Sequence, residues 1–347
     1  MKSLMDKKNV IGVAEGEKWT NGKTTGQKAI LVFVEQKEAV SSLDPDDIIE
    51  NEIDGLPTDV VGKSGKFVAE ITRKLRPQMQ AQGSKARKRA KARARAKARR
   101  KALAKARARA KARARARAKA AKRKATKKKK KKTEKIYKLN PKKRSRPIIG
   151  GLSVSHRKVT AGTIGAIFKD SKKRVVMLSN NHVLANTNNA KKGDIIYQPG
   201  TYDSSPKPQN VIGYLADFVP LKNGTNQDSA IAVVKGPYQP TINRIGKPTG
   251  TRAAKIGLTV VKSGRTTNLT KGRIIGINGK FKVNYGNKSC IVKNCIVTTD
   301  MSKGGDSGSL LLDTNKKAVG LLFAGSDTMT LHNPISPIIK RYKLKFL

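Results

Sequence analysis

The chain has 347 residues and a formal net charge of +53 at pH 7, and this charge is unevenly spread. Residues 84–132 contain 28 Lys or Arg and no acidic residue, so subtracting them from +53 leaves +25 on the rest. A positive field of this kind favours nucleic acid, anionic lipid headgroups or acidic polymers as partners. The length allows one large domain together with a smaller one.

The composition also argues against several classes of protein. No apolar run approaches the roughly 18 residues of a membrane span, and no signal-peptide core follows the first residues. We therefore expect a soluble protein, cytoplasmic or otherwise intracellular. The chain has three histidines, and Cys290 and Cys295 lack a CxxC partner, so we expect no metal and no cofactor. The two cysteines could form one small-loop bridge, but we expect two reduced thiols in or near strands.

The first 80 residues predict a small α+β unit. Asn9–Val13 and Lys28–Glu35 are apolar, β-branched runs typical of strands, with a turn signal between them at Asn21-Gly22. Asp44-Pro45 and the acidic residues after it are typical of a helix start, with Asp44 as the N-cap. Thr58–Val61 is a plausible third strand.

Residues 81–146 form a low-complexity basic linker. Alanine alternates with Lys or Arg from Lys85 onward, and Lys127 to Lys132 is an unbroken lysine run. These residues favour helix, but like charges one turn apart repel and no apolar stripe is present. We expect disorder in the free protein and helix formation when anions neutralise the charge.

We expect this linker to bind a polyanion such as DNA or RNA. The candidate contacts are Lys85, Arg87, Arg93, Arg99, Arg107, Arg113, Lys127 and Lys132. No aromatic side chains are interleaved to stack on bases, so the binding should be sequence-independent and weakened by salt. A solvated spacer, or a low-complexity expansion in a tolerant linker, explains the same composition.

From residue 147 to residue 347 the pattern changes to short apolar runs separated by Gly, Asn and Lys. Val175–Leu178, Ala230–Val234 and Val319–Phe323 are examples. Regular short strands with turn signals between them predict an all-β sandwich or barrel. A stretch of about 200 residues suits a two-barrel arrangement in one domain.

The hexapeptide Gly304–Ser309 lies between a polar loop and the apolar run Leu310–Leu312. A serine on a glycine-flanked turn can expose its hydroxyl beside converging backbone N–H groups, as acyl transfer requires. A glycine-rich hairpin turn fits the same six residues. Taken singly, His182 fits a core histidine and Asp228 a strand-entry cap. Together with Ser307 they give the order His, Asp, Ser, separated by 46 and 79 residues and placed at strand ends.

These three residues, in their contexts, resemble the signature motifs of the chymotrypsin-like (trypsin-like) serine peptidases. Gln198–Gly200, Lys262–Thr267 and Leu321–Ser326 also resemble the narrow-leaf group of trypsin-like peptidases in plants and bacteria. The resemblance covers essentially all of the chain from residue 147 onward and, more faintly, the amino-terminal unit. It implies a mainly β, two-barrel chymotrypsin-like peptidase domain, with the basic linker as an insertion.

The resemblance also implies roles for individual residues. Ser307 would attack the scissile carbonyl while His182 takes its proton and Asp228 orients the imidazole. The backbone N–H groups of Gly305 and Ser307 would form the oxyanion hole. Asp306 would be a structural carboxylate, and its partner cannot be named from the sequence.

The implied substrate pocket has Met301 at its base and Phe323, Ala324 and Gly325 along the strand that pairs with substrate. Gly325 would leave the pocket open, which favours an apolar or small side chain. A slip of one residue would place Asp300 at the base instead. The pocket would then accept Lys or Arg, and the enzyme could cut its own basic linker.

Three functions remain open on this reading. The first is an active serine endopeptidase that the linker concentrates on a polyanionic surface. The second is an inert peptidase fold that acts as a nucleic-acid-binding or architectural protein. The third is a self-processing peptidase whose linker is removable.

Overall fold

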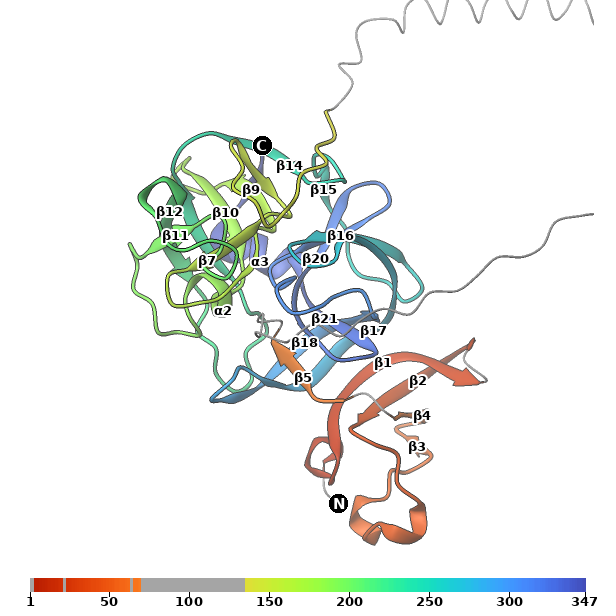
Figure 1. Ribbon diagram of the computed structural model, residues 1–347. Helices are drawn as coiled ribbons and strands as arrows, with labels where there is room; N and C mark the ends of the chain where they lie inside the picture. Colours follow the sequence, from red (N-terminus) through yellow and green to blue (C-terminus); the bar gives the residue numbers. More distant parts are fainter. Residues whose placement is uncertain (1–2, 21–22, 63–64, 70–134) are drawn as a thin grey trace, which may run out of the picture. The chain divides into compact units, whose positions relative to one another are not determined.

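The structure is a computed structural model that describes residues 3–20, 23–62, 65–69 and 135–347 (Figure 1). The described residues all belong to one compact unit. The predicted polyanion contacts, from Lys85 to Lys132, lie outside the described residues, as does the predicted turn at Asn21-Gly22. None of the helices described here is long and apolar enough to cross a lipid bilayer.

The first half of the predicted β domain is an eight-stranded antiparallel sheet in the order β22-β9-β10-β13-β12-β11-β7-β8. Its strands are β7 (Ser153–His156), β8 (Gly162–Thr163), β9 (Ala166–Lys169), β10 (Val175–Ser179), β11 (Ile195–Tyr197), β12 (Val211–Phe218), β13 (Ala230–Val234) and β22 (Lys345–Phe346). Aliphatic side chains from these strands fill two buried clusters, one containing Met177 and the other Phe168. The second cluster also takes in Leu310 and Leu312 of the other sheet, so it holds the two halves together.

The second half is a twelve-stranded sheet with the main order β16-β19-β20-β21-β18-β17-β1-β2-β4-β3, which β5 and β15 join at the side. Its strands are β1 (Val10–Thr20), β2 (Lys23–Val34), β3 (Glu52–Ile53), β4 (Leu56–Val61), β5 (Phe67–Ala69), β15 (Gly250–Thr251), β16 (Thr259–Gly264), β17 (Asn268–Asn284), β18 (Ser289–Thr299), β19 (Leu310–Asp313), β20 (Lys317–Gly325) and β21 (Met329–Pro334). Cys290 and Cys295 of β18 are free and buried, as predicted.

The remaining elements are short. They are the parallel pair β6 (Ile148–Gly150) and β14 (Tyr238–Ile242), helices α2 (Asn181–Leu184) and α3 (Ile335–Tyr342), and the 3-10 helices Leu4–Asp6, Val40–Ser42, Pro45–Asp47 and Pro208–Asn210. On α3, Ile335, Ile338 and Tyr342 recur at helical spacing and are buried in the same cluster as Phe168. The mainly β class and the division into two sheet halves are confirmed.

The helix predicted to begin at Asp44 is absent. Pro45–Asp47 forms a single 3-10 turn, and Ile48 is already extended. The next residues form the hairpin β3–β4, in which Ile53 pairs with Leu56 across Asp54-Gly55. Asp54 and Gly55 both have positive φ, at 50° and 75°, which is the conformation that a two-residue hairpin turn requires. The Asp-Gly hairpin signal therefore outweighed the N-cap signal, and the described part of this segment contains no α-helix.

The amino-terminal strands also extend the second sheet instead of standing apart from it. β1 pairs antiparallel with β17, and Gly12 lies opposite Phe281. A Cβ on Gly12 would lie 2.0 Å from the Phe281 ring, so only glycine allows this close approach. The boundaries at residues 80/81 and 146/147 stay predictions.

Candidate active site

His182 and Asp228 come together because β10 and β13 are antiparallel neighbours. Ser179 at the end of β10 pairs with Ala230 at the start of β13. His182 in helix α2, which follows β10, therefore lies close to Asp228, which precedes β13. His182 Nδ1 lies 2.5 Å from Asp228 Oδ2, and both side chains are fully buried. The other carboxylate oxygen accepts the backbone N–H of Asn181 at 2.7 Å. Both carboxylate oxygens are therefore occupied, and the imidazole is held by one of its two nitrogens.

Groups from both halves support this pair. The Asn180 side chain donates to the Asp228 carbonyl at 2.7 Å, and the Asp228 N–H donates to the Asn333 side chain of β21 at 2.8 Å. The ring of Tyr285 lies 5.8 Å from the His182 ring. Burial and the nearby charge of Asp228 raise the pKa of Tyr285 well above its usual value, so the phenol stays neutral. Sequence reasoning did not find Asn333 or Tyr285, because nothing local marks them.

The other imidazole nitrogen, His182 Nε2, is buried and has no hydrogen-bond partner among the described residues. Ser307 Oγ donates to the Phe323 carbonyl at 3.3 Å. The structure thus brings His182 and Asp228 into contact and does not link Ser307 to His182 by a hydrogen bond. A rotation of the serine side chain about one bond, χ1, changes the direction of its hydroxyl.

Two backbone carbonyls anchor the turn that carries Ser307. Thr266 Oγ1 donates to the Gly304 carbonyl at 2.7 Å, and Thr163 Oγ1 donates to the Gly305 carbonyl at 2.9 Å. Gly305 has φ of 101°, a value that favours glycine. The N–H groups of Gly305 and Ser307 donate to no group in the described part of the chain. A trans peptide directs its N–H away from its C=O, so Thr266 fixes the direction of the Gly305 N–H.

Asp306 has a partner that the sequence did not name. Lys262 Nζ lies 2.9 Å from its carboxylate, and both side chains are fully buried. The same carboxylate accepts the Thr267 hydroxyl at 2.6 Å and the Thr266 N–H at 2.8 Å. Asp306 is therefore a structural carboxylate, and Lys262–Thr267, a segment already noticed in the sequence, holds the turn in place.

The predicted pocket residues lie in different environments. Met301 packs in an apolar cluster with Val260 and Ile274, which gives it a packing role, and its place at the pocket base stays a prediction. Phe323 and Ala324 are buried in another cluster, and Gly325 ends β20. Asp300, the alternative base, lies 3.8 Å from Lys303 Nζ, with its side chain 35% exposed.

Polar groups that the sequence did not single out lie next to Met301, whose backbone N–H donates to Thr330 Oγ1 at 3.2 Å. Ser302 Oγ and Thr330 Oγ1 are 2.9 Å apart, and Thr298 Oγ1 lies 3.0 Å from His332 Nε2. Burial, together with the charge of Lys262, lowers the pKa of His332 to about 3, so this imidazole is neutral at physiological pH.

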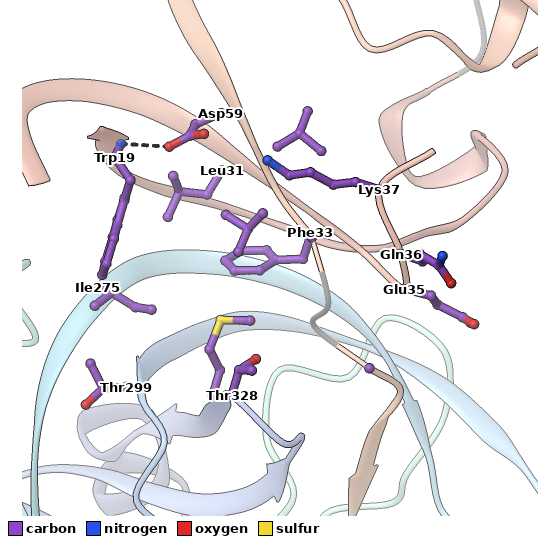
Figure 2. Close-up of a pocket in the computed structure, with 15 residues that line it drawn as sticks. Trp19, Leu31, Phe33, Glu35, Gln36, Lys37, Asp59, Ile275, Thr299 and Thr328 are labelled. Carbon is purple, nitrogen blue, oxygen red and sulfur yellow. Dashed lines mark hydrogen bonds between the residues drawn. The ribbon is translucent and has the colours of Figure 1, made fainter. Parts of the chain in front are cut away.

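A separate cavity of about 900 Å³ lies between the amino-terminal strands and β17, β18 and β21. Figure 2 shows Trp19, Leu31 and Phe33 on one side of it and Ile275 and Thr299 on the other, with the Trp19 N–H bonded to Asp59 at 2.7 Å. None of the predicted catalytic residues lines this cavity. It therefore does not form part of the His182 site.

The arrangement can now be compared with known proteins. A sequence model of the trypsin family matches residues 137–344. The chain belongs to the trypsin family. Serine protease 2 of Streptomyces fradiae is 33% identical over 127 residues, which are 37% of this chain and 64% of that protein. Streptogrisin-A of Streptomyces griseus is 30% identical over 148 residues, which are 41% of this chain and 45% of that protein. Each match spans less than two thirds of the relative's own length.

Solved protease structures are also similar to this chain. Nocardiopsis protease (NAPase) is 19% identical with a TM-score of 0.44, over 57% of this chain and 97% of that one. Cellulomonas bogoriensis chymotrypsin is 23% identical with a TM-score of 0.44, over 58% of this chain and 98% of that one. The narrower likeness to the narrow-leaf group stays a prediction.

Proposed function

We propose that this member of the trypsin family is a serine endopeptidase whose catalytic residues are His182, Asp228 and Ser307. The observation that carries the proposal is the state of His182. Asp228 holds its Nδ1 at 2.5 Å, and its Nε2 is buried and has no hydrogen-bond partner in the part of the chain that the structure describes. A buried polar atom left without a partner costs free energy, so such an atom suits a role in which a reacting group supplies the partner.

In the proposed reaction, Ser307 Oγ forms a bond to the scissile carbonyl carbon while its proton passes to His182 Nε2. The carbonyl π electrons move to the oxygen, and the N–H groups of Gly305 and Ser307 stabilise the negative charge. The tetrahedral intermediate collapses, the C–N bond breaks, and His182 returns the proton to the leaving amine. Water then repeats the sequence on the acyl-enzyme and releases Ser307.

Asp228 acts through His182 in this scheme. Its carboxylate fixes the Nδ1–H tautomer, which leaves the Nε2 lone pair free to accept the serine proton. It also stabilises the imidazolium that forms in the transition state. The backbone N–H of Asn181 and the Asn333 side chain fix the position of Asp228, so the carboxylate needs little reorganisation during the reaction.

Hydrolysis of a defined peptide library tests this proposal and reads the side-chain preference at the same time. We expect the full chain to cut after apolar or small residues, as the Met301 and Gly325 assignments imply, and Ser307→Ala to cut nothing. Cutting after Lys or Arg would favour Asp300 as the pocket base. A folded full chain that neither cuts a peptide nor reacts with a small alkyl fluorophosphonate would favour the inert, architectural reading.

We further propose that the basic linker binds polyanions. Its 28 positive charges between residues 84 and 132 support this by composition, since neutralising phosphates releases counterions. The test is retardation of a short DNA duplex and of an equally charged heparin fragment at several salt concentrations. Binding that falls steeply with salt and disappears on deletion of residues 84–132 supports the proposal, and binding that survives the deletion contradicts it.

A further inference from the structure

One edge of β20 leads directly to the proposed nucleophile. Leu321 of β20 pairs with Leu310 of β19. The next residue, Leu322, exchanges backbone hydrogen bonds of 2.8 and 3.0 Å with the two residues that follow Ser307. The residue after that, Phe323, accepts the Ser307 hydroxyl at 3.3 Å. A strand that pairs with the next residues of this edge, Ala324 and Gly325, would therefore lead to Ser307.

β5 occupies that next part of the edge. It pairs antiparallel with β20, with Ala69 opposite Ala324 and Val68 opposite Gly325. In this register the carboxyl-terminal direction of β5 runs toward Phe323 and Ser307. The acyl half of a peptide substrate precedes the scissile bond, so it must approach a nucleophile with its carboxyl-terminal end. β5 has this polarity, and it binds by adding a strand to a sheet edge.

Two of the three side chains of β5 are buried in the apolar core. Phe67 and Ala69 are 1% and 0% exposed, whereas Val68 between them is partly exposed. The Phe67 ring meets Phe281 of β17 edge-on, with 4.9 Å between ring centroids. The other edge of β5 pairs in parallel with β17, where Phe67 lies opposite Val283. Alternate side chains thus fill two apolar positions, one large and one small.

We propose that β5 is an internal inhibitor, which occupies the groove along Ala324 and Gly325 that receives the acyl half of a peptide substrate. This inference rests on the proposed function of Ser307. Residues up to Ala69 then keep other peptides off β20 for as long as β5 is in place. β5 also specifies the substrate class: an extended peptide with a large aromatic residue at the position of Phe67 and a small one at that of Ala69.

The test uses the full chain and two variants at one position. Val68→Pro removes the N–H that a strand residue donates to its neighbour, and it alters a partly exposed side chain. Val68→Ala keeps that N–H and is the matched control. Each protein is treated with two probes: a small alkyl fluorophosphonate, and a peptidyl phosphonate with Phe-Val-Ala on its acyl side. The small probe needs only the nucleophile, whereas the peptidyl probe also needs the β20 edge.

We expect the ratio of peptidyl to small-probe labelling rates to rise at least about tenfold in Val68→Pro, because the fraction of chains with a free groove limits apparent affinity. Val68→Ala should keep the wild-type ratio. Equal ratios in all three proteins would overturn the proposal. Failure of the small probe in all three would refute the function of Ser307 itself. Amide hydrogen exchange then tests whether β5 occupies the edge of β20. Faster exchange at Ala324 and Gly325 in Val68→Pro supports this occupancy, and unchanged exchange contradicts it.

Discussion

Lys262 Nζ lies 2.9 Å from the carboxylate of Asp306, and neither side chain is exposed to solvent. Asp306 immediately precedes Ser307 in the sequence, so this ion pair ties the nucleophile turn to β16. The attraction between two buried charges is largely offset by their lost hydration. The larger consequence appears when one partner is removed, because the other charge is then left buried and unpaired.

Lys262→Met should therefore lower the free energy of unfolding by about 3–5 kcal/mol, the usual cost of breaking a buried ion pair from one side. Urea unfolding at neutral pH measures this loss. The double variant Lys262→Met with Asp306→Asn should recover part of it, since no buried charge remains and the amide oxygen can still accept the Thr266 N–H. A loss below about 1 kcal/mol in the single variant would show that the pair does not stabilise the fold.

Thr266→Val should reduce kcat and leave KM nearly unchanged. The substitution keeps the shape of the side chain and removes the hydroxyl that holds the Gly304 carbonyl, so the Gly305 N–H is free to turn away from the oxyanion. We expect a fall of up to about 10²-fold, the lower end of the effect of losing one oxyanion donor outright. Thr249→Val, which removes a hydroxyl bonded to the Asn315 carbonyl at an exposed site, is the control. Equal kcat in the two variants would argue against a positioning role for Thr266.

Asp228→Asn should lower kcat by about 10⁴-fold, because an amide no longer fixes the Nδ1–H tautomer of His182. Steady-state peptide hydrolysis measures the loss, and circular dichroism reports whether the fold is kept. Asp217→Asn is the matched control, since Asp217 pairs with Lys192 and Arg341 and, among the described residues, no hydrogen bond joins it to His182, Asp228 or Ser307. Full activity in Asp228→Asn would remove Asp228 from the catalytic set.

His332 should make the fold sensitive to acid. Burial and the charge of Lys262 lower its pKa to about 3 in the folded chain, whereas an unfolded histidine has a pKa of about 6.5. Below about pH 6.5 the unfolded chain binds a proton at His332, whereas the folded chain does not. The free energy of unfolding therefore decreases as the pH falls from about 6.5 toward about 3. The slope is about 1.4 kcal/mol per pH unit for one proton. His332→Gln should lack this contribution in urea unfolding between pH 7.5 and pH 4.5, and identical slopes would contradict the prediction.

Local patterns allowed much of the fold to be predicted from the sequence. The strands at β2, β10, β13 and β20 follow from short β-branched runs, and the contact between His182 and Asp228 was implied by the resemblance to trypsin-like peptidases. The helix after Asp44 was wrong because a capping signal was given more weight than the Asp54-Gly55 turn. That turn decides the local structure, since it is built from φ values that few residue types accept.

Other features depend on pairings between distant residues. Lys262 has the sequence character of a surface residue, and only its burial against Asp306, 44 residues later, shows its role. Phe67–Ala69 is a three-residue strand with no distinctive pattern, yet it pairs with residues more than 200 positions away. Asn333 supports Asp228 across 105 residues. No local periodicity could reveal these contacts, because they join residues that are far apart in the sequence.

Ser307 is proposed to be an activated nucleophile, and fluorophosphonate labelling of the folded full chain tests this role most directly. Tandem mass spectrometry of the labelled protein should place one adduct on Ser307. The adduct should be absent in Ser307→Ala, and its formation should be strongly slowed in His182→Gln, which lacks the base. A folded wild-type chain that gains no adduct, or an adduct that persists in Ser307→Ala, would show that Ser307 is not the nucleophile.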